Sequence, residues 1–199
     1  MSRQASRRGS VLVISGTGGA GKGTIVERIR SQHPELWWSV SWATRPPRSG
    51  EVDGVHYWFR NVDEFVALRQ AGGFIEWADV YGVLKGTPEA PLRGALAQGH
   101  DALLEMDIQG AINLVQRIPE ATVVFVVAPS LDIQADRLRA RSTDSEPDIQ
   151  RRLDEAHAEH QLALANGFRI VVNENIDRAI AEIAAILEDS REAAPRPPE

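Results

Sequence analysis

The residues with the clearest chemical signature directly follow a short apolar run near the start of the chain. They read Gly16-Thr17-Gly18-Gly19-Ala20-Gly21-Lys22-Gly23-Thr24, and a pattern typical of a helix comes next. Glycines permit backbone conformations that other residues avoid, so successive N–H groups can turn inward around a phosphate. A helix N-terminus and Lys22 supply positive charge at the same point. The G-x-x-x-x-G-K spacing in a strand, loop and helix context therefore predicts a phosphate-binding loop.

One position of this loop departs from the general pattern. Gly23 stands where a Ser or Thr hydroxyl usually touches Mg2+, and either Thr24 or a water molecule could take over that contact. The competing interpretation, a glycine-rich turn that binds nothing, is disfavoured by the number of matched features and by their context.

A second group of charged residues lies in a stretch stiffened by two prolines. Arg45 and Arg48 stand three residues apart, with Glu51 and Tyr57 close behind. Guanidinium groups match the oxygens of a phosphate, so this spacing suits a phosphate clamp. On spacing alone, a solvated basic turn is an equally good interpretation.

Several further motifs decide between these interpretations. In chain order, and together with the loop at Gly16 and residues 39–59, they are Phe74-Ile75-Glu76-Trp77-Ala78, Gly86-Thr87-Pro88, Asp107-Ile108-Gln109-Gly110, Ala128-Pro129-Ser130-Leu131 and Val171-Val172-Asn173. In this order and spacing the chain resembles the guanylate kinases, which are nucleoside monophosphate kinases with a phosphate loop, from about residue 11 to residue 187.

The resemblance implies ATP and GMP as substrates, with Mg2+ accompanying ATP, and it assigns roles to individual residues. The ATP-binding set would be Gly16, Gly18, Gly19, Ala20, Gly21, Lys22, Gly23, Thr24, Arg137 and Asn173. The GMP-binding set would be Ser41, Arg45, Arg48, Glu51, Tyr57, Glu76, Lys85, Thr87 and Asp107. The charges acting on the transferred phosphoryl group would be Lys22, Arg45, Arg141 and Arg152, and Thr24 and Asp107 would face the metal, partly through water.

The residue types expected around the base also fit guanine on chemical grounds. Guanine presents N1–H and N2–H₂ side by side, so one carboxylate such as Glu76 can accept both hydrogen bonds. Adenine presents an acceptor at N1, which that carboxylate would repel. The hydroxyls of Ser41 and Thr87 can donate to guanine O6, and a site whose buried polar groups stay unpaired rejects the wrong base. Taken alone, Glu76 could equally be a solvated acid.

The sequence also departs from the guanylate kinase pattern. Lys85 stands where a tyrosine would touch the GMP phosphate, and it could supply charge in place of a hydroxyl or indicate a different acceptor. Milder departures are Thr17-Gly18 for Pro-Ser, Ala43 for Thr, Glu105 for Asp and Ser142 for the lid glycine. Two alternatives therefore stay open: a related kinase acting on another small phosphorylated acceptor, and a non-catalytic guanylate-kinase-like binding module. The intact Lys22 and its glycines disfavour the second.

The elements that must hold these residues follow from the apolar pattern. Near-continuous apolar runs at residues 11–15, 38–42, 102–106, 122–128 and 168–172 predict five strands of a parallel sheet buried on both faces. Helical spacing at residues 23–32, 88–98, 108–117, 131–139, 148–165 and 177–189 places helices between them. The alternation predicts an α/β fold, a three-layer sandwich built on a five-stranded parallel sheet.

Two segments interrupt this alternation. Residues 41–87 are rich in Gly, Trp and Tyr and predict an inserted small α+β subdomain, with short strands around one helix at 62–71 that Asn61 and Glu64 would cap. The family resemblance implies that this subdomain binds GMP. Arginines on both sides of a polar break resemble the lid of this family, and the resemblance implies a helical lid at about 137–152. We expect a flexible terminus at 1–10, a guanylate-kinase-like domain at 11–190 with its core at 11–40 and 88–190, and a flexible tail at 191–199.

Composition narrows the remaining possibilities. The chain has 199 residues, 22 basic and 28 acidic, and no cysteine. These values disfavour nucleic acid as the main partner and exclude disulfides, thiol catalysis and cysteine-bound metals. No apolar run is long enough for a membrane span or a signal peptide, so we expect a cytoplasmic protein, with its oligomeric state left open.

Overall fold

The centre of the molecule is a five-stranded sheet. The computed structural model describes residues 8–80, 82–140 and 145–193. The strands lie in the order β2 (Trp37–Trp38), β7 (Ala102–Glu105), β1 (Val11–Gly16), β8 (Thr122–Val127) and β9 (Arg169–Val172). Every neighbouring pair is parallel, as the near-continuous apolar runs predict.

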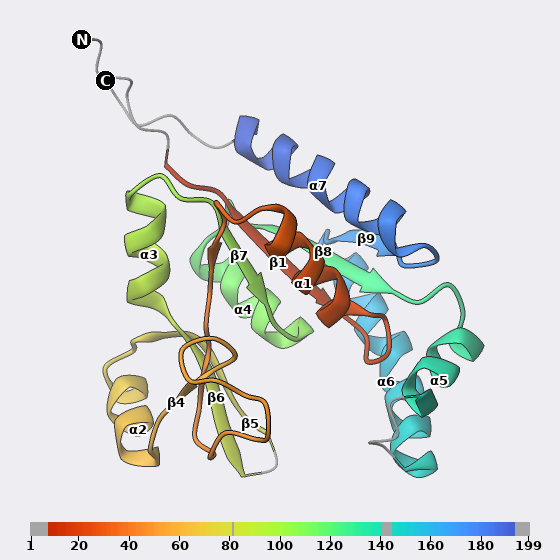
Figure 1. The fold of residues 1–199 in the computed structure, drawn as a ribbon, viewed down its shortest axis with the longest axis horizontal. Helices are drawn as coiled ribbons and strands as arrows, with labels where there is room; N and C mark the ends of the chain where they lie inside the picture. The colour runs from red at the N-terminus through yellow and green to blue at the C-terminus, as the bar shows by residue number, and fades with distance from the viewer. Residues whose placement is uncertain (1–7, 81, 141–144, 194–199) are drawn as a thin grey trace.

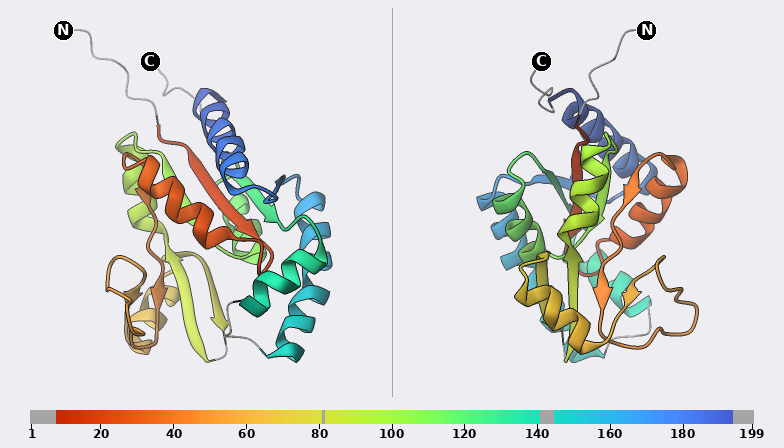
Figure 2. Two further views of the ribbon diagram at one scale, coloured as in Figure 1. Left: turned by 45° about the vertical axis from the view of Figure 1, so that its right-hand side comes forward. Right: turned by 90° about the vertical axis from the view of Figure 1, so that its left-hand side faces the viewer.

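Helices cover both faces of this sheet, and the side chains of β1 alternate between them. Val11 and Val13 pack under α3 (Glu89–Ala97), α4 (Ile108–Arg117) and α6 (Glu146–Ala165). Leu12 and Ile14 pack under α1 (Lys22–Gln32) and α7 (Ile176–Ala193). Figure 1 and Figure 2 show these three layers, so the predicted α/β sandwich is confirmed.

A second sheet lies below the first in the view of Figure 1. Its strands are β4 (Trp58–Phe59), β3 (Trp42–Ala43), β6 (Val83–Pro88) and β5 (Phe74–Val80), in that order, and α2 (Val62–Gln70) packs against it. Phe65 of α2 stacks on Phe74 with ring centroids 4.3 Å apart. Asn61 and Glu64 form the complete capping box that begins α2.

The sequence prediction was wrong for two details of this region. The run at 38–42 is not one strand: Trp37 and Trp38 pair with β7, whereas Trp42 and Ala43 pair with β4 and β6. Hydrophobicity alone cannot show that a chain passes from one sheet to another. The insertion also contains a hairpin of seven- and six-residue strands, β5 and β6, longer than the short strands expected.

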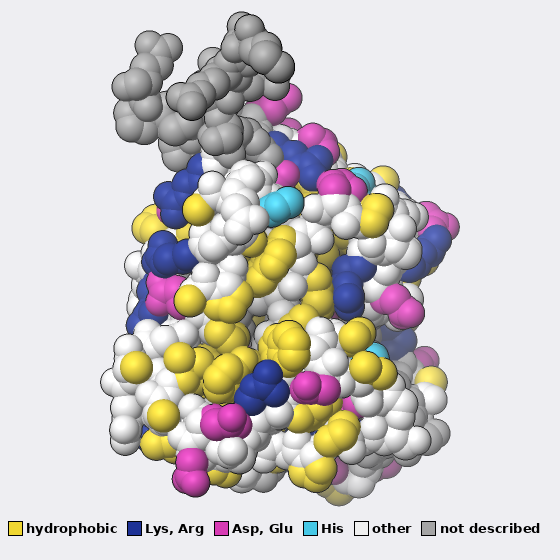
Figure 3. Space-filling model, turned by 60° about the vertical axis from the view of Figure 1, so that its left-hand side comes forward, with side chains coloured by type: hydrophobic (Ala, Val, Ile, Leu, Met, Phe, Trp, Pro, Cys, Tyr) yellow, Lys and Arg dark blue, Asp and Glu magenta, His cyan; other side chains and the backbone are white. Residues whose placement is uncertain are grey.

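The remaining helix, α5 (Leu131–Ala140), packs on α6 through Ala135, Leu138 and Ile149 rather than on the sheet. Gln134 of α5 hydrogen-bonds to Gly18, just after the carboxyl end of β1, so this helix stands at the edge of the sheet where α/β folds bind their ligands. None of the helices in the described part of the chain has the length and apolar character that crossing a bilayer requires. On the face in Figure 3, positive and negative side chains are interspersed, and apolar side chains gather in the lower half.

Candidate functional site

The glycine-rich loop connects the carboxyl end of β1 to the N-terminus of α1. Gly19 and Gly21 have φ angles of 80° and 91°, in the left-handed region that favours glycine. Gly21 is the N-cap of α1, and no side chain caps the helix there. The first amides of α1 therefore open into the loop and can bind an anion.

Lys22, the first residue of α1, places its ammonium group across this loop. Its Nζ donates to the carbonyl oxygens of Gly16, at 2.5 Å, and Thr17, at 3.0 Å. The positive end of the helix dipole and the lysine charge thus act on the same volume.

Asn173, at the end of β9, supports the other side of the loop. Its Nδ2 donates to the backbone carbonyl of Ala20 at 2.8 Å. The backbone carbonyl of Asn173 accepts a hydrogen bond from Arg137 Nη2 at 2.9 Å. A cavity of about 440 Å³ opens here, lined by Gly19, Gly21, Thr24, Arg137, Ala140, Asn173, Glu174 and Ile176. Five residues of the predicted ATP set thus line one cavity.

Side chains of α5 and α6 also reach the loop. Gln134 of α5 is buried and donates from Nε2 to the carbonyl of Gly18 at 2.7 Å. Arg152 of α6 lies beside Gly18, because a Cβ built on that glycine would stand 3.4 Å from the Arg152 guanidinium. Arg141 and Ser142 lie outside the described residues.

Three polar side chains meet at the β5–β6 hairpin. Thr87 Oγ1 donates to Glu76 Oε1 at 2.6 Å and lies 3.2 Å from Ser41 Oγ. Glu76 and Thr87 are paired across the hairpin, after a bulge between Phe74 and Glu76 that shifts the register of β5. Burial raises the pKa of the Glu76 carboxyl, and the nearby charge of Asp107 raises it further.

Asp107 reaches this site from the main sheet. It is the N-cap of α4 and accepts a hydrogen bond from the Gly110 amide at 2.8 Å. A Cβ on Gly110 would lie 3.3 Å from Glu76 Cγ, so α4 and the hairpin are in close contact here. The four residues expected around guanine, namely Ser41, Glu76, Thr87 and Asp107, therefore belong to one constellation.

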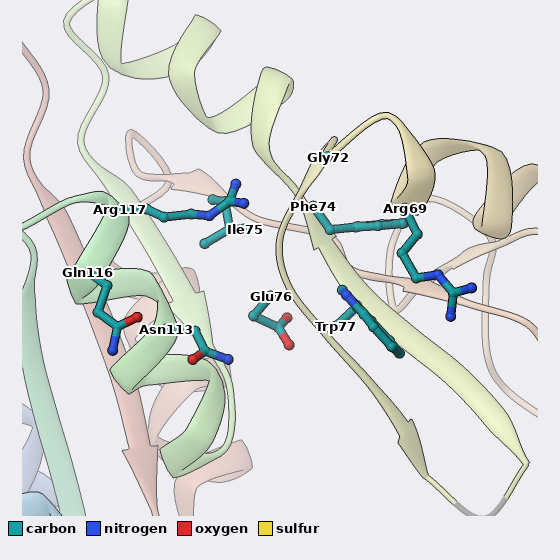
Figure 4. Close-up of a pocket in the computed structure, with 9 residues that line it drawn as sticks. All are labelled: Arg69, Gly72, Phe74, Ile75, Glu76, Trp77, Asn113, Gln116 and Arg117. Carbon is teal, nitrogen blue, oxygen red and sulfur yellow. The ribbon is translucent and has the colours of Figure 1, made fainter.

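Glu76 also lines a separate cavity of about 270 Å³. Figure 4 shows the Glu76 carboxylate between Asn113 of α4 and Trp77. Arg69 lies 4.7 Å over the Trp77 ring, and Arg117 donates to Glu89 at 2.6 Å. Of the four residues expected around guanine, only Glu76 lines this cavity, so the cavity is distinct from the predicted base site.

The expected phosphate clamp forms an ordered cluster. Arg45 donates to both carboxylate oxygens of Glu51, at 2.5 and 2.7 Å, and the backbone amide of Arg48 donates to Glu51 at 2.7 Å. The Arg45 side chain, only 11% exposed, lies 5.4 Å from the ring centres of Tyr57 and Phe59. The hydrogen bonds from Arg45 and from the Arg48 amide lower the pKa of Glu51 to about 2.

Lys85, the main departure from the family pattern, joins this cluster. Its Nζ lies 5.2 Å from the centre of the Tyr57 ring, the ring that Arg45 also faces. Three cationic residues, Arg45, Arg48 and Lys85, thus belong to one part of the insertion.

The sequence analysis did not single out Glu159, a partly buried acid of α6. Burial raises the pKa of this α6 carboxyl, the charge of Lys22 opposes that shift, and Asp107 adds to it. The glutamate therefore stands within electrostatic reach of both Lys22 and Asp107. An acid in a helix with many other acids carries no sequence signal of this kind.

Comparison with known proteins gives a consistent result. The family model described as guanylate kinase matches residues 8–190. A guanylate kinase of Synechococcus sp. strain JA-3-3Ab is 43% identical over 186 residues, 93% of this chain and 85% of its own. One from Neisseria gonorrhoeae is 41% identical over 94% of this chain and 91% of its own. The crystal structure of a guanylate kinase from Anaplasma phagocytophilum superposes with a TM-score of 0.70 at 29% identity, covering 94% of this chain and 87% of that one.

Proposed function

The chain belongs to the guanylate kinase family, and we propose on this basis that it transfers the γ-phosphoryl group of ATP to GMP, giving ADP and GDP. The observation that carries the proposal is the hydrogen-bonded set of Ser41, Glu76 and Thr87. One carboxylate held by a buried hydroxyl matches the two adjacent donors of guanine and opposes the N1 acceptor of adenine.

The two substrates would meet between the phosphate loop and the insertion. ATP would take the cavity beside Asn173 with its phosphates on the loop, and the phosphate of GMP would bind at Arg45, Arg48 and Tyr57. Phosphoryl transfer needs an in-line arrangement and compensation of the charge on the moving group. Lys22, Arg45, Arg152 and Arg141 would supply that charge.

A magnesium ion would enter with ATP. Thr24 and Asp107 offer a hydroxyl and a carboxylate, and no group of three or more His, Cys, Asp or Glu side chains suited to a metal occurs in residues 8–80, 82–140 and 145–193. Mg2+ commonly takes one or two protein oxygens, with phosphates and water completing its shell. When bound, it would neutralise phosphate charge. A cytoplasmic location, where both nucleotides are supplied, belongs to the same proposal.

The test is a coupled ADP-release assay with ATP and magnesium across GMP, AMP, CMP and UMP. We expect fast turnover with GMP and at least 10²-fold lower kcat/KM with AMP, because AMP would leave buried acceptors unpaired. Lys22→Met is the matched control: it should lose ATP affinity while its melting curve stays that of a folded protein. The absence of ADP release with GMP, in a protein that binds ATP, would overturn the proposal.

Lys85 favours one second candidate, a kinase for a different small phosphorylated acceptor. The ammonium group beside Tyr57 adds positive charge at a position where the family has tyrosine. Lys85→Tyr separates the two candidates. If GMP is the acceptor, Lys85→Tyr should keep GMP turnover within about threefold, since either side chain can donate one hydrogen bond to a phosphate. If GMP is not the natural acceptor, the Lys85→Tyr variant should phosphorylate GMP clearly faster than the wild type does.

A further inference from the structure

Two amide side chains from different elements hold carbonyl groups of the phosphate loop. Gln134 of α5 donates from Nε2 to the Gly18 carbonyl at 2.7 Å, and Asn173 at the end of β9 donates from Nδ2 to the Ala20 carbonyl at 2.8 Å. Gln134 is 3% exposed and Asn173 is 4% exposed. Hydrogen bonds buried in this way are strengthened by the low dielectric around them. They therefore fix the direction of the two carbonyl groups.

The direction of each carbonyl group also sets the direction of the next amide. Peptide units are planar, and none in the described part of the chain is cis, so the C=O and N–H of one unit point in opposite directions. Because Gln134 holds the Gly18 carbonyl toward α5, the Gly19 N–H points away from that helix. Asn173 sets the Gly21 N–H in the same manner. Gly19 and Gly21 both have positive φ angles, a backbone pattern that lets neighbouring amides converge on an anion.

The helix that carries Gln134 lies directly against the loop but packs apart from the sheet. A Cβ built on Gly19 would stand 3.0 Å from Leu138 Cγ and 3.2 Å from Gln134 Cγ. Ala135 and Leu138 of α5 form a small apolar cluster with Ile149 of α6. Among the described residues, α5 contributes no buried side chain to the two apolar clusters that cover the sheet. Figure 1 and Figure 2 show α5 beside the turn between β1 and α1, so a shift of this helix would reach the loop through Gln134.

We propose that Gln134 is a positioning residue of the phosphate loop, which holds the peptide unit between Gly18 and Gly19 so that the Gly19 N–H donates to a phosphate of ATP. The inference rests on the proposed ATP site and adds to it a residue outside the glycine-rich motif. Gln134 acts through this one peptide unit and does not itself contact the nucleotide. Without its donor the unit can rotate, so the amide must be ordered again when the nucleotide binds, and affinity falls.

The test is the dissociation constant of ADP, measured by calorimetry on the full chain with magnesium. Gln134→Met keeps the length of the side chain and removes its donor, and we expect ADP to bind about tenfold more weakly. Gln134→Glu, whose carboxylate would face the Gly18 carbonyl, should weaken binding further and decides the question if Gln134→Met does not fold. Ala135→Gly is the matched control, because it weakens α5 and its packing on α6 but keeps the Gln134 donor. Its ADP affinity should stay within about threefold of the wild type.

The amide resonance of Gly19 in ¹H–¹⁵N spectra gives a direct readout. Donation to a phosphate should move the Gly19 amide proton downfield when ADP binds to the wild type, and this shift should be largely lost in Gln134→Met. A purely structural role of Gln134 would lower the melting temperature in Gln134→Met and in Ala135→Gly alike and leave the shift in place. Unchanged ADP affinity in both Gln134 variants, an equal loss in Ala135→Gly, or an unchanged Gly19 shift would overturn the proposal.

These measurements separate the positioning role from the proposed kinase activity, since none of them needs GMP. A protein that binds ADP as expected but releases none from ATP in the presence of GMP would overturn the kinase proposal and leave the role of Gln134 supported. A wild type that does not bind ADP would overturn both.

Discussion

Thr87 Oγ1 donates a 2.6 Å hydrogen bond to Glu76 Oε1 across the β5–β6 hairpin. Thr87 is 1% exposed, so this bond is shielded from water and fixes one oxygen of the Glu76 carboxylate. Burial disfavours the charge of that carboxylate and raises the pKa of Glu76. The other oxygen keeps its capacity to accept hydrogen bonds from a bound base.

Glu76→Gln tests whether this carboxylate recognises guanine. The amide oxygen can still accept from Thr87, but the amide cannot accept both N1–H and N2–H₂ of guanine. We expect kcat/KM for GMP to fall about 10²-fold while the dissociation constant of ATP changes by less than threefold. Steady-state kinetics and an ATP titration measure both. Equal losses for the two substrates would show that Glu76 does not bind the base.

The same substitution should stabilise the fold at neutral pH. Burial raises the pKa of Glu76, so the folded state holds this proton at pH values where the unfolded chain releases it. The stability tied to the protonated form is complete below the unfolded pKa of about 4.5 and is lost as pH rises through the folded value. Urea unfolding should therefore show Glu76→Gln more stable than the wild type at pH 7 and the difference shrinking by pH 4. A difference independent of pH would contradict this.

Ionisation of Glu51 should stabilise the folded protein, whereas ionisation of Glu76 should destabilise it. Its pKa lies near 2 because Arg45 and the Arg48 amide hydrogen-bond to the ionised form. The stability from this pair is present above pH 4.5 and is lost as pH falls toward 2. We expect Glu51→Gln to unfold with a flatter pH dependence in that window and to raise the KM for GMP about tenfold, since Arg45 loses the charge that orients it. Glu64→Gln, at an exposed acid of α2, is the matched control for KM.

The sequence predicted the main sheet apart from its β2 edge, the helices that cover it, and the glycine-rich turn between β1 and α1, because the spacing of apolar residues and of glycines is a local property. It did not predict that Gln134 contacts the loop or that the charge of Lys22 acts on Glu159. Gln134 and Gly18 are 116 residues apart, and nothing local to either indicates that α5 will cover the loop. The guanine constellation was predicted from resemblance, since no periodicity relates Ser41 to Glu76 and Asp107.

Asn173 is expected to maintain the shape of the phosphate loop. In Asn173→Asp the group that donates to Ala20 becomes an acceptor facing a carbonyl, at a position only 2.8 Å away. Leaving that buried carbonyl unpaired should cost about 1–3 kcal/mol of unfolding free energy. The KM for ATP should rise about tenfold, with the KM for GMP nearly unchanged. Asn175→Asp, outside the cavity, controls for the added charge. If Asn173→Asp leaves the ATP kinetics unaltered, Asn173 does not belong to the ATP site.

Two glycines of the loop should respond very differently to the same added methyl group. Gly21 has a φ of 91°, and a Cβ there would stand 2.5 Å from Asn173 Nδ2, so Gly21→Ala combines backbone strain with a steric clash. Gly23 is helical, and a Cβ there would meet nothing within 4 Å. We expect Gly21→Ala to lower kcat/KM for ATP at least 10²-fold, because a misplaced loop loses both its amides and the position of Lys22. Gly23→Ala should keep activity within threefold and raise stability by up to about 1 kcal/mol through helix propensity. If both variants behave alike in turnover and melting assays, the loop does not hold phosphate through the conformation seen at Gly21.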